Sequence, residues 1–243
     1  MIALIDADSI IYRFAAVCQD VFSWDGDNTI VETDEKKAKR ELLELLDTIL
    51  EHTKCDSYEF ILSPDRNFRY DVDPSYKSNR KKPEIPLYLI PILKEWATKE
   101  LGAFTPSYVE ADDYVVAKAT GNPELYTICH IDKDLNQAAG RHYNYNTQEK
   151  YTISQEEADF FFYQQALEGD SIDGIKGCPA IGKKKSIRLL SELDPKDYWA
   201  GIVGAYEKAG QTEDDAIRNA RLVRMLRHGE YDFETEAITL WSP

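Results

Sequence analysis

The chain has 243 residues, 43% of them hydrophobic, so it can bury the core of one domain or of a domain with a smaller lobe. Its formal net charge of −15 argues against a general attraction to nucleic-acid phosphates, and no apolar run approaches the roughly 20 residues of a membrane helix. Met1 to Val17 lacks the basic start of a signal peptide, and the four cysteines include no C-x-x-C pair; we expect a reducing cytoplasm and neither a zinc site nor a disulfide framework.

The first part of the chain alternates short apolar runs with amphipathic stretches. The run 2–5 predicts a strand that leads into a helix, with Ser9 as the N-cap. Further strands are predicted for 58–62, 103–108 and 125–131, hairpins for 21–32 (turning at Asp25-Gly26) and 143–153, and helices for 34–52, 86–101 and 111–120. Because strands that alternate with helices pair in parallel, the sequence predicts an α/β fold with a mainly parallel sheet.

The second part of the chain is helical. From Ser154 onward the apolar spacing is helical with short loops, and Ser154 with Glu157 fits a capping box. We therefore predict an α/β domain over 1–153 and a helical lobe over 154–243.

Acidic residues recur where the predicted strands end, and in parallel sheets sites lie beyond those ends. Two of them, Asp132 and Asp134, are two residues apart and can point the same way. Clustered acids need cations to stay ionised, and Mg²⁺ prefers oxygen ligands. Because the chain has 44 acidic residues and most Asp and Glu side chains are solvated, this pattern alone predicts only a metal-dependent hydrolase or phosphoryl transferase. The nine candidate ligands are Asp6, Asp65, Glu110, Asp112, Asp113, Asp132, Asp134, Asp170 and Asp173.

Basic residues gather in two segments despite the negative net charge. The first segment holds Arg66, Arg69, Lys77, Arg80, Lys81 and Lys82, and the second holds Lys176, Lys183, Lys184, Lys185 and Arg188. In the second segment Gly177 and Gly182 bracket a tight turn before a predicted helix over 183–190. Since backbone N–H groups at a helix N-terminus bind anions, this loop can hold a phosphate without reading a base. The alternatives are a solvated face and a turn before a surface helix.

Four stretches resemble the flap endonuclease and 5′-3′ exonuclease family, which includes the 5′-nuclease domain of bacterial DNA polymerase I and phage 5′ nucleases. The order and spacing agree over roughly residues 1–230, and Asp132-Lys-Asp134 matches the family's paired aspartates. The four stretches are Leu4-Ile-Asp6, Phe68-Arg69 to Tyr76-Lys77-Ser-Asn-Arg80, Val109-Glu110-Ala-Asp112-Asp113, and Gly169-Asp170-Ser-Ile-Asp173 through Gly177, Ile181, Gly182 and Lys183.

The resemblance implies a PIN-like nuclease domain over 1–153, with a basic, partly helical arch or clamp at 66–85. It also implies a DNA-binding lobe over 154–243 with a helix-three-turn-helix motif at 168–190. Lys77 and Arg80 match the family's phosphate-steering residues, and Tyr76 is expected to stack on a base. By position, the first metal site would comprise Asp6, Asp65, Glu110 and Asp112, the second Asp132, Asp134, Asp170 and Asp173, with Asp113 as an outer ligand. DNA contacts are expected from Arg13, Arg66, Arg69, Lys81, Lys82, Lys176, Gly177, Gly182, Lys183, Lys184 and Lys185.

The activity implied is two-metal-ion hydrolysis of DNA at 5′ ends, flaps or overhangs, with the ions roughly 3.5–4 Å apart. Two Mg²⁺ ions, replaceable by Mn²⁺, and a K⁺ ion at the helix-three-turn-helix loop are the implied cofactors. The implied setting is replication or repair, by a monomer in the cytoplasm of a bacterium or phage-infected host.

Two departures from the family pattern stand out. The family often has Gly after the first aspartate, whereas this chain has Ala7-Asp8, which makes Asp8 a water-mediated ligand or a helix cap. The segment between Asp65 and Pro86 is short for an arch that closes around a 5′ end. The sequence leaves three other functions open: a nuclease for RNA or RNA·DNA hybrids, a non-catalytic junction-binding protein, and an acidic metal-binding protein, which would not explain the basic segments.

Overall fold

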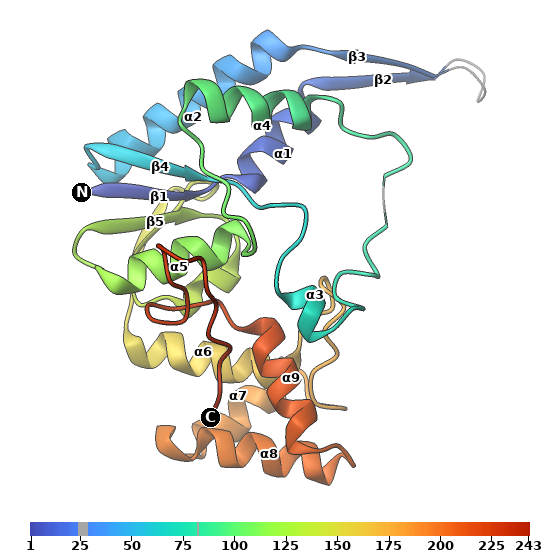
Figure 1. The fold of residues 1–243 in the computed structure, drawn as a ribbon, viewed down its shortest axis with the longest axis vertical. Coiled ribbons are helices and arrows are strands. Elements are labelled where there is room, and N and C mark those ends of the chain that lie inside the picture. Colours follow the sequence, from blue (N-terminus) through green and yellow to red (C-terminus); the bar gives the residue numbers. More distant parts are fainter. Residues whose placement is uncertain (24–28, 82) are drawn as a thin grey trace.

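The computed structural model describes residues 1–23, 29–81 and 83–243. Its centre is a five-stranded sheet in the order β4-β1-β5-β6-β7 (Figure 1). The neighbouring strands are parallel except for the β6–β7 pair. The strands are β1 (Ile2–Asp6), β4 (Ser57–Ile61), β5 (Tyr126–His130), β6 (Gly140–Asn144) and β7 (Glu149–Ile153). The prediction of a mainly parallel α/β sheet is confirmed.

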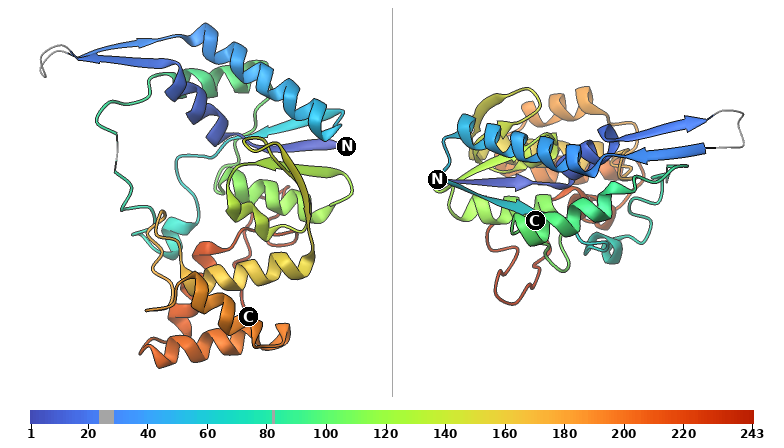
Figure 2. Two further views of the ribbon diagram at one scale, coloured as in Figure 1. Left: turned by 180° about the vertical axis from the view of Figure 1, so that it is seen from behind. Right: turned by 90° about the horizontal axis from the view of Figure 1, so that it is seen from above.

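Helices cover both faces of this sheet. In Figures 1 and 2, α1 (Asp8–Val17), α2 (Glu35–Thr53) and α4 (Leu89–Glu100) lie on one side, and α5 (Ala111–Gly121) lies on the other. Successive strand residues point to opposite faces, so Ile5 packs with the α1–α2–α4 layer while Leu4 packs with α5. Burial of both faces explains why the strand sequences are continuous apolar runs.

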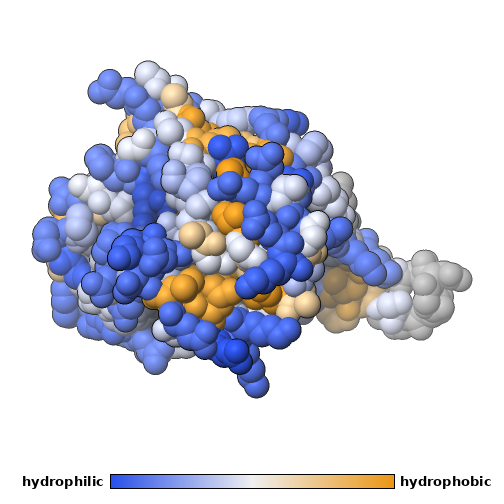
Figure 3. All heavy atoms as spheres, turned by 90° about the horizontal axis from the view of Figure 1, so that it is seen from below, coloured by the Kyte–Doolittle hydropathy of each residue, from blue (hydrophilic) through white to orange (hydrophobic). Residues whose placement is uncertain are grey.

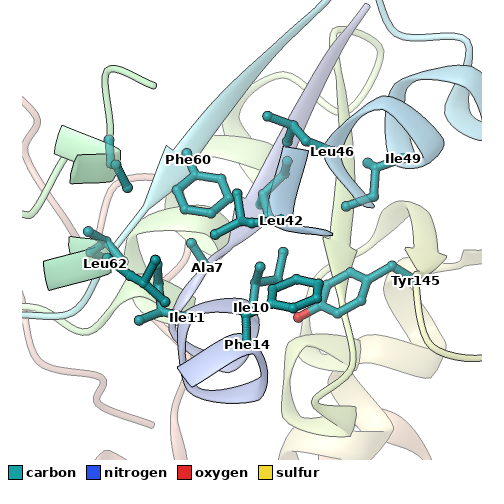
Figure 4. Packing of buried hydrophobic residues seen from close by; sticks show 14 of the residues in the cluster. Ala7, Ile10, Ile11, Phe14, Leu42, Leu46, Ile49, Phe60, Leu62 and Tyr145 are labelled. Carbon is teal, nitrogen blue, oxygen red and sulfur yellow. The ribbon is translucent and has the colours of Figure 1, made fainter. Parts of the chain in front are cut away.

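The core of the α1–α2–α4 layer is built from regularly spaced side chains. Ile10 and Phe14 of α1 and Leu42, Leu46 and Ile49 of α2 are buried in one cluster (Figure 4). Their spacings of three and four residues place them on single helix faces. This packing fixes α1 directly behind the carboxyl end of β1.

Two local predictions are corrected. The helix α1 begins at Asp8 with Ala7 at its N-cap, so Ser9 is not the cap. Residues 103–108 form no strand: Phe104 makes one parallel bridge with Ile61, and Pro106 then removes the N–H that the next ladder bond needs.

The hairpin predicted for 21–32 is confirmed as β2 (Gln19–Ser23) and β3 (Thr29–Thr33), and it projects from the body of the protein (Figure 1). Its predicted turn at Asp25-Gly26 lies outside the described residues. The capping box of Ser154 and Glu157 is present at the start of α6 (Gln155–Glu168).

The helical half comprises α6, α7 (Lys183–Ser191), α8 (Tyr198–Lys208) and α9 (Glu213–Val223). Its core also takes in Tyr76 from the first half of the sequence, while Met225, which follows α9, packs between the sheet and α5, and the next residue, Leu226, packs in a cluster with Ala117 of α5. The two halves therefore interlock, and a division at residue 153 remains a prediction. The face below α8 is mostly hydrophilic, with separate hydrophobic areas (Figure 3).

The basic segment has little regular structure. It contains the short helix α3 (Arg69–Val72), and the described residues between α3 and α4, 73–81 and 83–88, form turns and extended chain. This chain runs along one side of the protein from the helical half to α4 (Figures 1 and 2). Within the described ranges, no helix is long and apolar enough to cross a membrane.

Candidate active site

Four predicted metal ligands lie at one edge of the sheet. The strand β1 ends at Asp6, and its parallel neighbour β5 ends two residues before Asp132. Glu110 is the N-cap of α5 and Asp112 lies in the first turn of that helix. Carboxylate oxygens of Glu110, Asp112 and Asp113 lie within 4.8 Å of one another. Because parallel strands end together, residues more than a hundred positions apart share this edge.

The electrostatics show that these groups interact. Burial, followed by the charges of Asp8, Asp132 and Glu110, raises the pKa of Asp6 to about 7. Burial also raises the pKa of Asp112, to which Asp113 and Glu110 add. Without a cation, the native fold thus disfavours the ionised form of these groups.

A second group of acids lies beside the first. Burial, the charge of Asp132 and the weaker effect of Asp170 together raise the pKa of Asp134 to about 6, although Lys133 opposes the shift. Asp134 accepts a hydrogen bond of 2.7 Å from Gln165 of α6. Asp132 and Asp134 are not on an extended strand: Asp132 caps the 3-10 helix η1 (Lys133–Gln137), accepting from the Asp134 N–H at 2.9 Å.

The basic segment supplies cations to these acids. Lys77 forms an ion pair with Glu110 and lies 3.7 Å from Asp173, and Arg80 forms an ion pair with Asp173. Although burial opposes it, the charges of Arg69 and Lys77 hold the pKa of Glu110 below its usual value. The Lys77 N–H also donates to the Asp173 carbonyl at 2.9 Å, which fixes this segment against the loop 170–175.

A set of polar contacts that the sequence did not predict joins Asp8, Ser63 and Lys94. Asp8 pairs with Lys94 of α4 at 2.9 Å and accepts from the Ser63 N–H at 2.8 Å. The Ser63 hydroxyl accepts from the Ala111 N–H at 2.9 Å, which ties the start of α5 to the start of α1. Asp8 also contributes to the raised pKa of Asp6. No local pattern could have singled out Lys94, because its partner is 86 residues away.

An open groove of about 920 Å³ runs past this edge. Its lining includes Asp6, Asp132, Arg13 and Arg80, so acids and arginines face the same space. Predicted DNA contacts at Arg13 and Lys81 are exposed, as is Arg66, which pairs with Asp71 at 2.6 Å. Lys82 lies outside the described residues.

Asp65 stands apart from the other predicted ligands. It is exposed and lies four residues beyond the end of β4. In the described ranges, no hydrogen bond or ion pair joins it to the other predicted ligands, so its metal role rests on the sequence.

The predicted DNA contact of Arg69 is wrong. Its side chain is 1% exposed, and it donates to both oxygens of Asp113 at 2.5 and 2.8 Å. It also donates to the carbonyls of Leu222 and Arg224, each at 2.7 Å. With these bonds Arg69 holds the end of α9 and the residue that follows it against the start of α5. The pair also engages both carboxylate oxygens of Asp113, whose expected role as an outer ligand stays a prediction.

The predicted base-stacking role of Tyr76 is also corrected. Its side chain is buried in the core of the helical half, and its hydroxyl lies 2.8 Å from Glu110 and 3.0 Å from Asp173. Burial raises the pKa of Tyr76, so it stays a neutral donor. Tyr76 therefore links the two groups of acids and presents no face to a base.

The glycine–lysine loop precedes α7, whose N-cap is Gly182. Lys183 and Lys184 are exposed there, while Lys185 donates to the Ala180 carbonyl at 2.8 Å. The nearby Lys176 is exposed as well. Positive charge therefore gathers at the N-terminus of α7, and phosphate binding there stays a prediction.

Gly177 allows two backbones to cross in this loop. Its φ is +65°, and a Cβ at this position would lie 2.3 Å from the Glu168 carbonyl carbon. We expect Gly177→Ala to lower the free energy of unfolding by at least about 3 kcal/mol, combining left-handed strain with overpacking. Gly182→Ser is the matched control, because a Cβ at Gly182 meets nothing within 4 Å and serine is a good N-cap. Urea unfolding midpoints measure the difference; equal midpoints would refute the backbone crossing.

Known proteins share the sequence and the fold of this chain. A family model of the 5′-3′ exonuclease N-terminal, resolvase-like domain matches residues 1–163. An exonuclease of Escherichia phage T7 is 28% identical over an alignment of 207 residues that covers 71% of this chain and 69% of that protein. DNA polymerase I of Rhizobium leguminosarum is 32% identical over 203 residues, covering 72% of this chain but 19% of the polymerase. A crystal structure of the phage T5 D15 protein with metal ions superposes with a TM-score of 0.71 at 17% identity, covering 91% of this chain and 88% of that one.

A parallel sheet that gathers carboxylates at its strand ends, beside a helical half, is the arrangement of a PIN-like nuclease. The chain belongs to the 5′-3′ exonuclease family, whose domain model matches more than half of it. It is thus a nuclease, and the resemblance seen in the sequence is confirmed.

Proposed function

We propose that the protein is a structure-specific 5′ nuclease that hydrolyses DNA phosphodiesters at 5′ ends, flaps or overhangs. The observation that carries this proposal is the meeting of three elements at one edge of the sheet. Carboxylates from β1, α5 and η1 lie there, and Lys77 and Arg80 reach the same acids from the basic segment. A phosphodiester beside this edge would meet both metal ligands and cations.

Divalent ions, Mg²⁺ in the cell with Mn²⁺ as a substitute, fit the chemistry of the donor set. The raised pKa values of Asp6 and Asp134 show acids whose ionised forms lack compensating charge. Carboxylate oxygens are the ligands that these hard cations prefer. We propose Asp6, Asp65, Glu110 and Asp112 for one ion, and Asp132, Asp134, Asp170 and Asp173 for the other. When bound, the two ions supply an activated water and stabilise the departing oxygen.

Lys77 and Arg80 contribute to the reaction through the phosphate. In this structure they neutralise Glu110 and Asp173. With Glu110 and Asp173 holding divalent ions instead, both side chains would be free to donate to a phosphate and stabilise its developing negative charge. Tyr76 keeps Glu110 and Asp173 at a fixed separation.

The pKa values predict how metal binding responds to pH. A divalent ion binds the ionised carboxylates, so it must displace the protons of Asp6 (pKa about 7) and Asp134 (pKa about 6). Affinity for Mn²⁺ is therefore expected to fall as pH drops from 8 to 5.5, by about tenfold per unit for each proton displaced. Titration calorimetry at several pH values measures this, and a pH-independent affinity would contradict it.

The glycine–lysine loop is proposed to hold the DNA backbone. Because Lys183 and Lys184 are exposed at the start of α7, replacing both by Ala should weaken DNA binding and reduce the slope of log affinity against log salt by about 2. Fluorescence anisotropy in EDTA measures both quantities. Lys36→Ala with Arg40→Ala removes the same charge from the exposed surface of α2 and should leave the slope unchanged. Equal slopes for the two double variants would contradict this role.

Several finer features belong to the same proposal. We include a K⁺ ion at the loop 168–190, action as a monomer, and tolerance of RNA·DNA hybrids, since contacts to the backbone need not exclude ribose. The proposed setting is DNA replication or repair in a bacterium or a phage-infected cell. Cleavage rates on matched substrates with an RNA or a DNA 5′ end would show whether the protein prefers one of the two.

The test is cleavage of a DNA flap labelled at its 5′ or its 3′ end, with Mg²⁺ and with EDTA. We expect Mg²⁺-dependent cutting near the junction of the 5′ flap, with a 5′ phosphate on the downstream product. A matched 3′ flap should stay intact. Tight binding to both flaps without cutting, in Mg²⁺ and also when Mn²⁺ replaces it, would support a non-catalytic junction-binding protein instead.

A further inference from the structure

Two buried histidines lie directly beneath the turn that carries Asp132 and Asp134. His130 ends β5 and His142 lies in β6, and each is 1% exposed. Burial lowers the pKa of His130 to about 3, with His142 adding to the effect, and burial lowers the pKa of His142 to about 4. The chemistry described above uses neither of them.

The imidazoles hold the two ends of η1. Nδ1 of His130 lies 2.5 Å from the carbonyl oxygen of Asp132, and Nε2 of His142 lies 2.9 Å from that of Ala138. These carbonyls belong to the N-cap and the C-cap of η1. Because a carbonyl oxygen only accepts, each imidazole donates one hydrogen bond outward to an end of the turn.

Tyr151 adds a third point of attachment. It lies opposite His142 on the neighbouring strand β7, with the two rings stacked at 5.2 Å. Its hydroxyl lies 3.2 Å from Nε2 of His130 and donates to Asn136, within the turn, at 2.9 Å. His130 also lies 3.0 Å from His142. The turn is thus held at its start by His130, in its middle by Tyr151 and at its end by His142, and ring packing joins these three buried side chains into one network.

We propose that His130, His142 and Tyr151 are positioning residues that set the orientation of Asp132 and Asp134 toward a divalent ion. This inference rests on the proposed metal role of those two acids. Mg²⁺ requires near-ideal octahedral geometry, so a small rotation of a ligand-bearing turn weakens binding. Partners behind metal ligands typically change metal affinity by about 10–100-fold when they are removed.

Asparagine and leucine separate the hydrogen bond from the packing. In His130→Asn the side-chain amide nitrogen takes the place of Nδ1 and can still donate to Asp132, whereas the similarly sized His130→Leu cannot. We expect His130→Leu to raise the Mn²⁺ dissociation constant by about 10–100-fold and His130→Asn to stay near wild type. His142→Gln and His142→Leu form the corresponding pair, because the glutamine amide nitrogen takes the place of Nε2.

Mn²⁺ binding is measured from the EPR signal of the free Mn²⁺ ion. The Mg²⁺ concentration that flap cleavage requires is measured in parallel. The expected pattern is a higher Mg²⁺ requirement in the leucine variants with an unchanged DNA affinity in EDTA. Equal Mn²⁺ affinity in leucine, amide and wild-type proteins would overturn the proposal, and so would equal losses in the leucine and amide variants, which would indicate packing alone.

Two further variants keep the test decisive. Tyr151→Phe removes only a hydroxyl; a folded variant with weaker Mn²⁺ binding supports the network, and unchanged binding overturns its third attachment. Asp132→Asn separates the two proposals. If it loses Mn²⁺ affinity while His130→Leu does not, only the positioning role fails; if it keeps full affinity, the proposed metal site fails.

Discussion

Arg69→Met is expected to destabilise the protein more than any other single substitution of a charged residue outside the metal ligands. It leaves the fully buried Asp113 without its partner and frees the carbonyls of Leu222 and Arg224. Breaking a buried ion pair costs about 3–5 kcal/mol. For a chain of this size that corresponds to a melting temperature lower by roughly 6–20 °C. Calorimetry or thermal unfolding by circular dichroism measures the shift.

A double substitution tests the cause. Arg69→Met with Asp113→Leu removes both charges, so it should be more stable than Arg69→Met alone, since no charge is then left buried. Arg66→Met is the control, because Arg66 pairs with Asp71 at the surface and should change stability by less than about 1 kcal/mol. Additive losses from Arg69→Met and Asp113→Leu would show that the two side chains do not act as a pair.

The largest expected effect on activity comes from Asp132→Asn with Asp134→Asn. These substitutions keep the size of both side chains and the cap of η1, but remove two negative charges from the second group of acids. Metal ions supply several kcal/mol of transition-state stabilisation. We therefore expect flap cleavage in Mg²⁺ to fall by at least about 10³-fold. Single-turnover rates on a 5′ flap measure this loss.

The control for this pair is Asp194→Asn with Asp197→Asn. These acids lie at η2 (Pro195–Asp197), in the helical half, and replacing them removes the same charge. The control should keep the wild-type cleavage rate, and DNA binding in EDTA should be no weaker in either double variant. A cleavage rate unaffected by Asp132→Asn with Asp134→Asn would exclude these acids as ligands.

The sequence predicted those features that local patterns determine. The spacing of leucines in 34–52 predicted α2 to within one residue at each end. Apolar runs ending in acids predicted that Asp6 and Asp132 meet, because parallel neighbours must end at the same edge. The capping box at Ser154 was predicted because all of its atoms come from four consecutive residues.

Features that depend on distant partners were not predictable in the same way. Arg69 and Asp113 are 44 residues apart, so no local pattern links them. Arg69 lies in a basic segment and was therefore predicted to contact DNA, whereas in the structure it is a buried cation that holds the fold together. Tyr76 was expected to stack on a base, since nothing in its neighbourhood shows that α6 and α9 will enclose it. The strand predicted for 103–108 does not form. Its apolar residues favoured a strand, but Pro106 lacks the N–H that the next hydrogen bond of the ladder requires.

Crystals of the protein grown or soaked with Mn²⁺ and examined by anomalous diffraction test the central claim most directly, because they locate the ions without reference to activity. We predict one anomalous peak among Asp6, Asp65, Glu110 and Asp112 and a second among Asp132, Asp134, Asp170 and Asp173, with Lys77 and Arg80 released from their acids. Saturating Mn²⁺ that leaves this edge of the sheet empty, with Lys77 still paired to Glu110, would contradict the account.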